Sequence, residues 1–205
     1  MKQPLKRWLL WILWSPILLV WRMLGWRPVG DDLYTIPKVV AIGAPHTSNW
    51  DVLLFLALAC HYCRAPKWMI KVEWNRPVIG PIMRFLGAVF IQRDKDMNVV
   101  DQAVREFNER HELLLVIAPE GTRKRVEYWK SGFYHIAHNA NVPIALAFVD
   151  YKRKIGGVLR VMTPTGDEEA DMQLIREAYE GIHARHPQNF GPVRLKPRGE
   201  NLPTT

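Results

Sequence analysis

A single α/β domain is the fold class that the sequence predicts, with a central mixed, largely parallel sheet flanked by helices. Apolar runs of strand length, rich in Val, Ile and Leu, occur at residues 39–42 and 113–117, and such runs are typical of strands buried on both faces. Helical spacing of apolar residues marks other segments, most clearly residues 97–110. A chain of 205 residues, 48% of them hydrophobic, is long enough for one domain with a sizeable core.

Predicted strands and helices alternate along most of the chain. Strands are predicted at residues 39–42, 67–71, 87–93, 113–117, 143–149 and 156–161. Helices are predicted at residues 52–59, within 75–85, at 97–110 and 132–139, and from Asp167 to near Arg185. The main domain is predicted to span residues 31–186. The Pro-rich residues 187–205 offer little to bury and are predicted to form a loosely ordered tail.

Residues 1–30 are predicted to form a helical segment that associates with a membrane. The apolar run from Trp8 to Trp21 covers about 14 residues and contains Pro16, whereas a spanning helix needs ~20. Five of the nine Trp residues lie in this segment, and Trp is enriched at the membrane–water boundary. We therefore expect a monotopic anchor on the cytoplasmic face, interfacial or re-entrant. A cleaved signal peptide is disfavoured for lack of a small-residue cleavage site, and a core helix remains the alternative.

The net charge of the chain limits the classes of binding partner that we expect. The formal net charge of +8 favours anionic partners such as phospholipid headgroups, coenzyme A, an acidic carrier protein or nucleic acid. Nucleic acid is set aside because no zinc finger, RNA-recognition motif or basic heptad segment is present. Cys60 and Cys63 are too few for a structural zinc site, and the low Cys content suits a reducing compartment.

His46 and Asp51 are the candidate catalytic residues. They lie between the predicted strand at 39–42 and the predicted helix at 52–59. A spacing of five residues places two side chains on different faces of a regular helix, so the pair meets only if His46 precedes the first turn. The N-cap formers in between, Thr47 to Asn49, favour that boundary. The pair then supplies a general base and the carboxylate that orients it, although a His and an Asp at a short spacing also occur by chance.

A second group of polar residues follows the predicted strand at 113–117. Glu120, Gly121, Thr122 and Arg123 stand where ligand sites gather in α/β sheets. Gly121 allows a close backbone approach, Thr122 offers a hydroxyl, and Arg123 is suited to bind a phosphate through two parallel hydrogen bonds. Glu120 is expected to orient Arg123 or to bind a substrate hydroxyl. The alternative is a solvated basic turn.

Two further cations end predicted strands. Arg93 is the last residue of the strand at 87–93, and Lys71 is the last residue of the segment at 67–71. Both are candidate phosphate ligands at the same edge of the sheet. Surface Lys and Arg are more often only solubilising.

Taken in order, these blocks resemble the glycerolipid acyltransferase family, whose best-known members are the 1-acyl-sn-glycerol-3-phosphate acyltransferases. The resemblance spans residues 37–161. His46 and Asp51 match the first motif, Gly87 to Arg93 the second, Glu120 to Arg123 the third, and Val142 to Ile144 the start of the fourth, with Lys130 and Gly132 in between. Gln92, Lys124 and Leu146 depart from the pattern, which leaves the acceptor headgroup open.

The resemblance implies a membrane-associated O-acyltransferase. Such an enzyme moves a fatty acyl group from acyl-CoA or acyl-acyl carrier protein to the free hydroxyl of lysophosphatidic acid, giving phosphatidic acid for phospholipid synthesis. It needs no metal or cofactor. Backbone N–H groups near Gly121 are candidates for stabilising the oxyanion. Another lyso-lipid acceptor, a thioester hydrolase or a non-catalytic lipid-binding protein are the alternatives, and the oligomeric state stays open.

Overall fold

A seven-stranded sheet organises the protein, seen here in a computed structural model that describes residues 12, 15–91 and 98–197. The strand order is β1-β7-β6-β2-β5-β3-β4, and all neighbours are parallel except β6 and β7. The strands are β1 (Arg27–Gly30), β2 (Lys38–Gly43), β3 (Pro66–Lys71), β4 (Ala88–Ile91), β5 (Leu113–Ile117), β6 (Ile144–Asp150) and β7 (Ile155–Met162). This is the mixed, largely parallel sheet that the sequence predicts.

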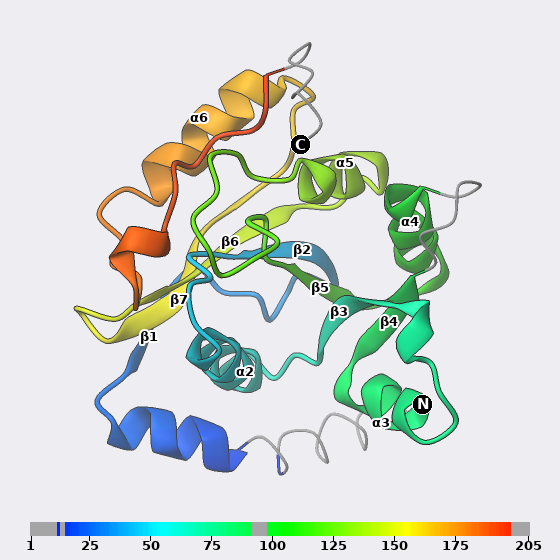
Figure 1. Cartoon of the computed structure of the whole chain (residues 1–205), viewed down its shortest axis with the longest axis horizontal. Helices are drawn as coiled ribbons and strands as arrows, with labels where there is room; N and C mark the ends of the chain where they lie inside the picture. Colours follow the sequence, from blue (N-terminus) through cyan, green and yellow to red (C-terminus); the bar gives the residue numbers. More distant parts are fainter. Residues whose placement is uncertain (1–11, 13–14, 92–97, 198–205) are drawn as a thin grey trace.

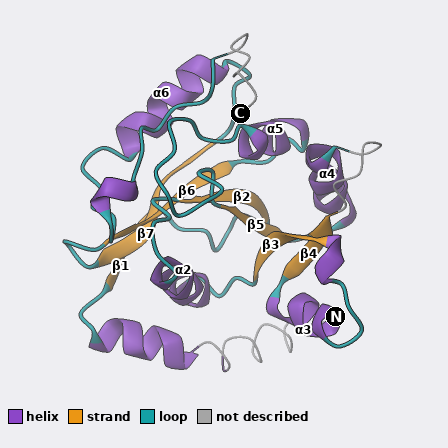
Figure 2. Ribbon diagram, in the orientation of Figure 1, coloured by secondary structure: helices purple, strands orange, loops and turns teal. Residues whose placement is uncertain are grey.

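Helices cover both faces of the sheet (Figure 1 and Figure 2). They are α2 (Trp50–His61), α3 (Ile79–Leu86), α4 (Val99–Glu109), α5 (Gly132–Asn139) and α6 (Glu168–Ala178), with short 3₁₀ turns η1 (Val72–Trp74) and η2 (Pro187–Asn189). Helices α4, α5 and α6 lie on one face, where Phe107, Phe133 and Ile175 join the larger core. Helix α2 lies on the other face, where Leu58 packs in a second core.

The two central strands explain why the apolar runs are continuous. Strand β2 pairs with β5 on one side and β6 on the other, and Val39 to Gly43 are buried, as is every residue of β6. A strand covered by helices on both faces has no solvent-facing side, so alternation is lost. The edge strand β1 contains Pro28, which lacks an N–H and is tolerated at an edge.

Three details differ from the sequence-based predictions. Strand β1 was not predicted, because its four residues, of which one is Pro and one Gly, carry no strand pattern. The last helix ends at Ala178 rather than near Arg185, and Gly181 follows in a left-handed conformation that stops it. The continuous apolar run at residues 52–59 predicts a buried helix, whereas Val52 and Leu53 of α2 are 49% and 41% exposed.

The N-terminal segment packs on the α2 face. Residues 15–23 are helical, and Trp21 and Trp26 are buried and stacked on each other with ring centroids 6.1 Å apart. These two rings thus belong to the core and not to an exposed aromatic belt; Trp8, Trp11 and Trp14 lie outside the described residues. Other side chains of the segment are exposed: Ile12, Leu19, Val20, Met23 and Leu24.

Within the described part of the chain, no helix combines the length and the apolar character required to cross a membrane.

Residues 187–197, the described part of the predicted tail, are attached to the domain. The Trp129 N–H donates to the Arg194 carbonyl at 2.8 Å, and Trp129 bridges to Leu195. Val193 is buried in the larger core. This segment therefore covers the loop that follows β5.

Candidate active site

The turn between β2 and α2 carries the candidate catalytic pair. Strand β2 ends at Gly43, and α2 begins at Trp50 with Asn49 as its N-cap. His46 therefore precedes the helix and Asp51 lies in its first turn, the arrangement that the spacing requires. The imidazole Nδ1 of His46 lies 3.4 Å from Oδ2 of Asp51, and the two side chains are 20% and 0% exposed. Because Nδ1 faces the carboxylate, Nε2 is the ring nitrogen left for a substrate.

Asp51 is fixed by hydrogen bonds to both of its oxygens. The backbone N–H groups of Thr47 and Ser48 donate to Oδ2 at 2.7 and 2.8 Å, and the hydroxyl of Tyr151 donates to Oδ1 at 2.6 Å. Burial alone would raise the pKa of Asp51, but the hydrogen bonds, led by those from His46 and Tyr151, outweigh burial and hold it below its ordinary value. The carboxylate stays ionised beside the imidazole.

Tyr151 is a member of the site that sequence analysis did not identify. It follows β6 and lies 100 residues beyond Asp51 in the chain. Burial, reinforced by the hydrogen bond to Asp51 and its negative charge, raises the pKa of Tyr151, so the phenol remains a neutral donor. A lone Tyr at a strand end carries no motif, and only the pairing of β6 next to β2 brings it to the catalytic turn.

Glu120 contacts the catalytic turn in a way that the sequence did not predict. Its Oε2 accepts a 2.8 Å hydrogen bond from the backbone N–H of His46, and it makes no described contact with Arg123. The side chain is 3% exposed, and Oε1 is a buried oxygen that has no hydrogen-bond partner among the residues that the structure describes. Burial raises the pKa of Glu120 to about 7, although the His46 N–H acts in the opposite direction. Glu120 thus ties the loop after β5 to the loop after β2.

Arg123 reaches the same turn from the loop after β5. Its guanidinium donates to the side-chain oxygen of Asn49, the N-cap residue of α2, and the Arg side chain remains exposed. Asn49 therefore orients the fork that Glu120 was expected to orient. This contact places the cationic group at the helix N-terminus, close to the His46 turn and open to solvent.

Gly121 and Thr122 shape the loop between Glu120 and Arg123. Gly121 has a left-handed φ of 67°, and the Lys130 side chain lies across it, 2.8 Å from where a Cβ would stand. The Gly121 N–H donates to the Ala118 carbonyl at 3.0 Å, so this N–H is already used, and the prediction that backbone N–H groups near Gly121 stabilise the oxyanion would have to rely on its neighbours. Thr122 accepts a 3.3 Å hydrogen bond from the Lys124 N–H.

The remaining predicted ligands cannot be placed in the site. Lys71 ends β3, next to β4, but its side chain lies outside what the structure describes, and so does the whole of Arg93. The two residues stay predictions. The described part of the site therefore joins His46, Asp51 and the Glu120 to Arg123 loop.

An apolar pocket of about 500 Å³ lies beside this loop. It extends from Gly121 and Lys130 between β3, β5 and α5. Its apolar lining comprises Trp68, Met69, Ile70, Val99, Val100, Val116, Ile117, Phe133 and Ile136. Such a lining suits the hydrocarbon part of a ligand, with one cation at the end near the catalytic turn.

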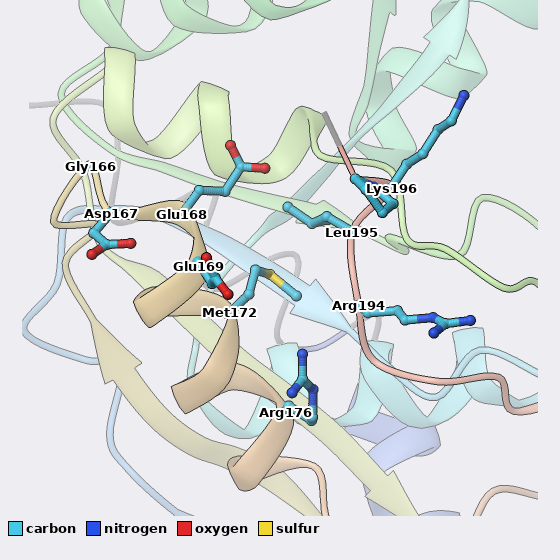
Figure 3. A pocket seen from close by; sticks show the side chains of 10 residues that line it. Gly166, Asp167, Glu168, Glu169, Met172, Arg176, Arg194, Leu195 and Lys196 are labelled. Carbon is cyan, nitrogen blue, oxygen red and sulfur yellow. The ribbon is translucent and has the colours of Figure 1, made fainter. Parts of the chain in front are cut away.

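A second pocket, of about 590 Å³, lies away from the catalytic turn (Figure 3). It separates the acidic first turn of α6 from residues 194–197, and the side chains of Arg194 and Lys196 extend away from that helix. None of the predicted site residues whose side chains the structure describes lines it. We therefore assign the chemistry to the β2–α2 turn.

Comparison with known proteins agrees with the motifs and the fold. The model of the family described as Acyltransferase matches residues 31–146, which is more than half of the chain. No curated protein matches the chain significantly. Among solved structures, the chain is similar to the crystal structure of the 1-acyl-sn-glycerophosphate (LPA) acyltransferase PlsC from Thermotoga maritima, with a TM-score of 0.57 and 18% sequence identity over 89% of this chain and 80% of that one. These matches confirm the resemblance to glycerolipid acyltransferases, and the chain belongs to the Acyltransferase family.

Proposed function

We propose that the protein is a membrane-associated O-acyltransferase that transfers a fatty acyl group from an acyl thioester to the free hydroxyl of lysophosphatidic acid. The observation that carries this proposal is the placement of His46 Nδ1 at 3.4 Å from the fully buried carboxylate of Asp51. That contact leaves Nε2 of a half-buried imidazole available as a general base. Family membership supplies the reaction class.

The reaction needs only one proton carrier. His46 Nε2 takes the proton from the acceptor hydroxyl while the hydroxyl oxygen attacks the thioester carbonyl carbon. A tetrahedral intermediate forms, its C–S bond breaks, and the imidazolium returns the proton to the leaving thiolate. The products are an ester and a free thiol, so atoms and charge balance without an acyl-enzyme intermediate.

Asp51 makes His46 effective at this step. Its depressed pKa keeps it anionic, so it accepts from Nδ1–H, fixes the tautomer that exposes the Nε2 lone pair, and stabilises the imidazolium as it forms. Complete burial strengthens this interaction, because the pair is poorly screened by solvent. A general base typically contributes about 10²- to 10⁴-fold to the rate, so its removal is expected to lower the rate by that factor.

Arg123 is the proposed ligand of the acceptor phosphate. Its guanidinium is exposed and is directed to the α2 N-terminus by Asn49. A guanidinium fork binds phosphate through two parallel hydrogen bonds, and the positive end of a helix adds to the attraction. Binding the phosphate there positions the acceptor hydroxyl near His46 and is therefore expected to control the acceptor KM.

The apolar pocket beside Gly121 is the proposed site for an acyl chain. A volume of about 500 Å³ and a lining from β3, β5 and α5 suit hydrocarbon. Lys130, at the end near the catalytic turn, offers a charge for a polar group of the same ligand. The donor is acyl-CoA or acyl-acyl carrier protein, and both present the same thioester.

Membrane association is proposed from the exposed apolar side chains on the α2 face. Leu19, Val20 and Met23 of the helix at residues 15–23 are 60%, 53% and 77% exposed. Val52 and Leu53 of α2, on the same side of the sheet, are also exposed. Such residues are favourably transferred into the boundary layer of a membrane, and the net charge of +8 favours an anionic surface.

The test is acyl transfer by purified, detergent-solubilised protein. Labelled acyl-CoA and acyl-acyl carrier protein would each be offered with lysophosphatidic acid, with lyso-lipids that carry a headgroup on the phosphate, and with water alone. Transfer to lysophosphatidic acid supports the proposal, and transfer only to another lyso-lipid corrects the acceptor. Thioester cleavage without an acceptor would instead identify a hydrolase. Lipid binding with neither reaction would identify a binding protein.

A further inference from the structure

Arg185 lies against the catalytic turn. Its guanidinium carbon is 5.5 Å from the ring centre of Trp50, the first residue of α2, and 5.7 Å from that of Tyr151, which binds Asp51. Among the described residues, no carboxylate forms an ion pair with it, and its side chain is exposed. Because the Arg185 guanidinium pairs with none of the described carboxylates, it is available to bind an anion at the site.

The segment that carries Arg185 is anchored on both sides. His183 Nδ1 lies 3.1 Å from the fully buried Asp150 carboxylate, and the His186 N–H donates to the Thr47 hydroxyl at 3.3 Å. The two aromatic rings restrict the guanidinium further through cation–π contacts. Less side-chain entropy is therefore lost when the fork binds a ligand.

Arg185 is not required as the counter-ion of Asp51. The carboxylate already accepts hydrogen bonds from Thr47, Ser48 and Tyr151 and faces His46. The charge of Arg185 and a hydrogen bond from its guanidinium to the Tyr151 hydroxyl both lower the pKa of Tyr151, against the larger effect of burial. Because the Arg185 side chain is exposed, the rest of its guanidinium fork remains open to a ligand from solvent.

From this geometry we infer that Arg185 is a second phosphate-binding residue of the active site. It approaches the α2 N-terminus from the segment after α6, whereas Arg123 approaches from the loop after β5; the two cations reach the consecutive residues Trp50 and Asn49. Arg185 lies beyond the residues that the family model matches, 31–146. The inference rests on the proposed function. The phosphate belongs either to the lyso-lipid acceptor or to the coenzyme A or phosphopantetheine part of the donor.

Equilibrium binding tests this independently of turnover. Lysophosphatidic acid and coenzyme A would be titrated separately by calorimetry into the wild type, Arg185→Gln, Arg185→Lys and a control, Arg160→Gln, which removes an exposed Arg from β7. We expect Arg185→Gln to lower the affinity for one of the two ligands by about tenfold or more, which is the loss typical of removing hydrogen bonds to a charged group. The affinity of Arg185→Lys should lie between those of the wild type and Arg185→Gln, and the affinity of Arg160→Gln should equal that of the wild type.

Kinetics and folding controls separate binding from structure. The KM of the substrate whose binding is weakened should rise in Arg185→Gln while kcat changes little, and unfolding temperatures should match. A fall in kcat with unchanged affinity for both ligands would overturn the inference and leave Arg185 a packing residue for Trp50 and Tyr151. Binding of both ligands by Arg185→Gln at wild-type affinity would overturn it while leaving the acyltransferase proposal standing. A wild type that neither binds nor transfers would reject both.

Discussion

The hydroxyl of Tyr151 donates a 2.6 Å hydrogen bond to Oδ1 of Asp51, a residue 100 positions earlier in the chain. This bond links the strand pair β6–β7 to the catalytic turn and completes the set of donors around a fully buried carboxylate. Tyr151 is therefore a positioning residue: it touches Asp51, and Asp51 orients the imidazole of His46.

Replacing Tyr151 by Phe should lower kcat without changing the acceptor KM. The ring keeps its edge contact with Trp26, at 5.2 Å between centroids, so only the hydroxyl is lost. A hydrogen bond to a charged group is worth ~1.5–3 kcal/mol, so we expect a fall of roughly tenfold or more in kcat. Steady-state kinetics with the acceptor varied checks this, and an equal rise in KM would contradict the assignment.

The same substitution should change the dependence of stability on pH. Asp51 has a folded-state pKa below its ordinary value of 3.8, so it stabilises the fold above pH 3.8 and loses this effect as the pH falls through the folded value. Tyr151→Phe raises the folded pKa. The difference in unfolding free energy between wild type and variant should therefore be full at pH 6 and shrink below pH 3.8. Urea unfolding at several pH values measures it.

Glu120→Gln should abolish the decrease in folding stability that the Glu120 carboxyl causes as the pH rises toward neutrality. The folded pKa of Glu120 is raised to about 7 from an ordinary 4.5, so the folded state binds more protons than the unfolded state between these values. Stability from this group therefore falls as the pH rises from 4.5 to 7, by roughly 3 kcal/mol at most. Gln keeps an acceptor for the His46 N–H.

Urea unfolding of wild type and Glu120→Gln at pH 5 and pH 8 tests this. The unfolding free energy of Glu120→Gln should increase relative to that of the wild type as the pH rises. Glu180→Gln, which changes an exposed side chain, should show the same pH dependence as the wild type. Parallel pH profiles for wild type and Glu120→Gln would show that the carboxyl is not protonated in the folded state near pH 6.

Arg123→Gln should weaken binding of the phosphate-bearing acceptor and leave the rate of the chemical step unchanged. Loss of a bidentate contact to phosphate is expected to raise the KM for lysophosphatidic acid by about tenfold or more. Monoacylglycerol, which lacks the phosphate, should be affected little. Arg160→Gln serves as the control for the loss of one positive charge. A uniform loss with both acceptors would assign Arg123 a role other than phosphate binding.

The exposed residues of the N-terminal helix provide a test of membrane association. Leu19 and Met23 are 60% and 77% exposed, and replacing both by Glu should weaken binding to anionic phospholipid vesicles by at least about tenfold. Leu174→Glu changes a residue that is 38% exposed on α6, on the opposite face of the sheet. Vesicle sedimentation that does not distinguish the two variants would reject this surface as the membrane contact.

Most of the fold could be predicted from local patterns. The runs at residues 113–117 and 132–139 coincide with β5 and α5, because a buried strand and an amphipathic helix leave clear apolar patterns. Strand β1 and the end of α6 were missed. A four-residue edge strand is defined only by its partner β7, and the pattern after Ala178 is interrupted by a left-handed Gly181.

The candidate site could be predicted only where a motif is contiguous. The spacing of His46 and Asp51 implied the helix boundary, and that prediction was confirmed. The contacts of Tyr151 and Arg185 depend on the pairing of β6 beside β2 and on the course of the chain after α6, and a single Tyr or Arg leaves no local pattern. Glu120 was identified, but its partner was not, because a backbone N–H 74 residues away is invisible in sequence.

The most direct test of the account is acyl transfer by His46→Ala. Purified wild type, His46→Ala and a control, His111→Ala, which changes an exposed His before β5, would be compared with acyl-CoA or acyl-acyl carrier protein and lysophosphatidic acid. We predict that His46→Ala loses about 100-fold or more of kcat, with vesicle binding and unfolding temperature unchanged, while His111→Ala retains full activity. Transfer by His46→Ala at the wild-type rate would contradict the assignment of His46 as the general base.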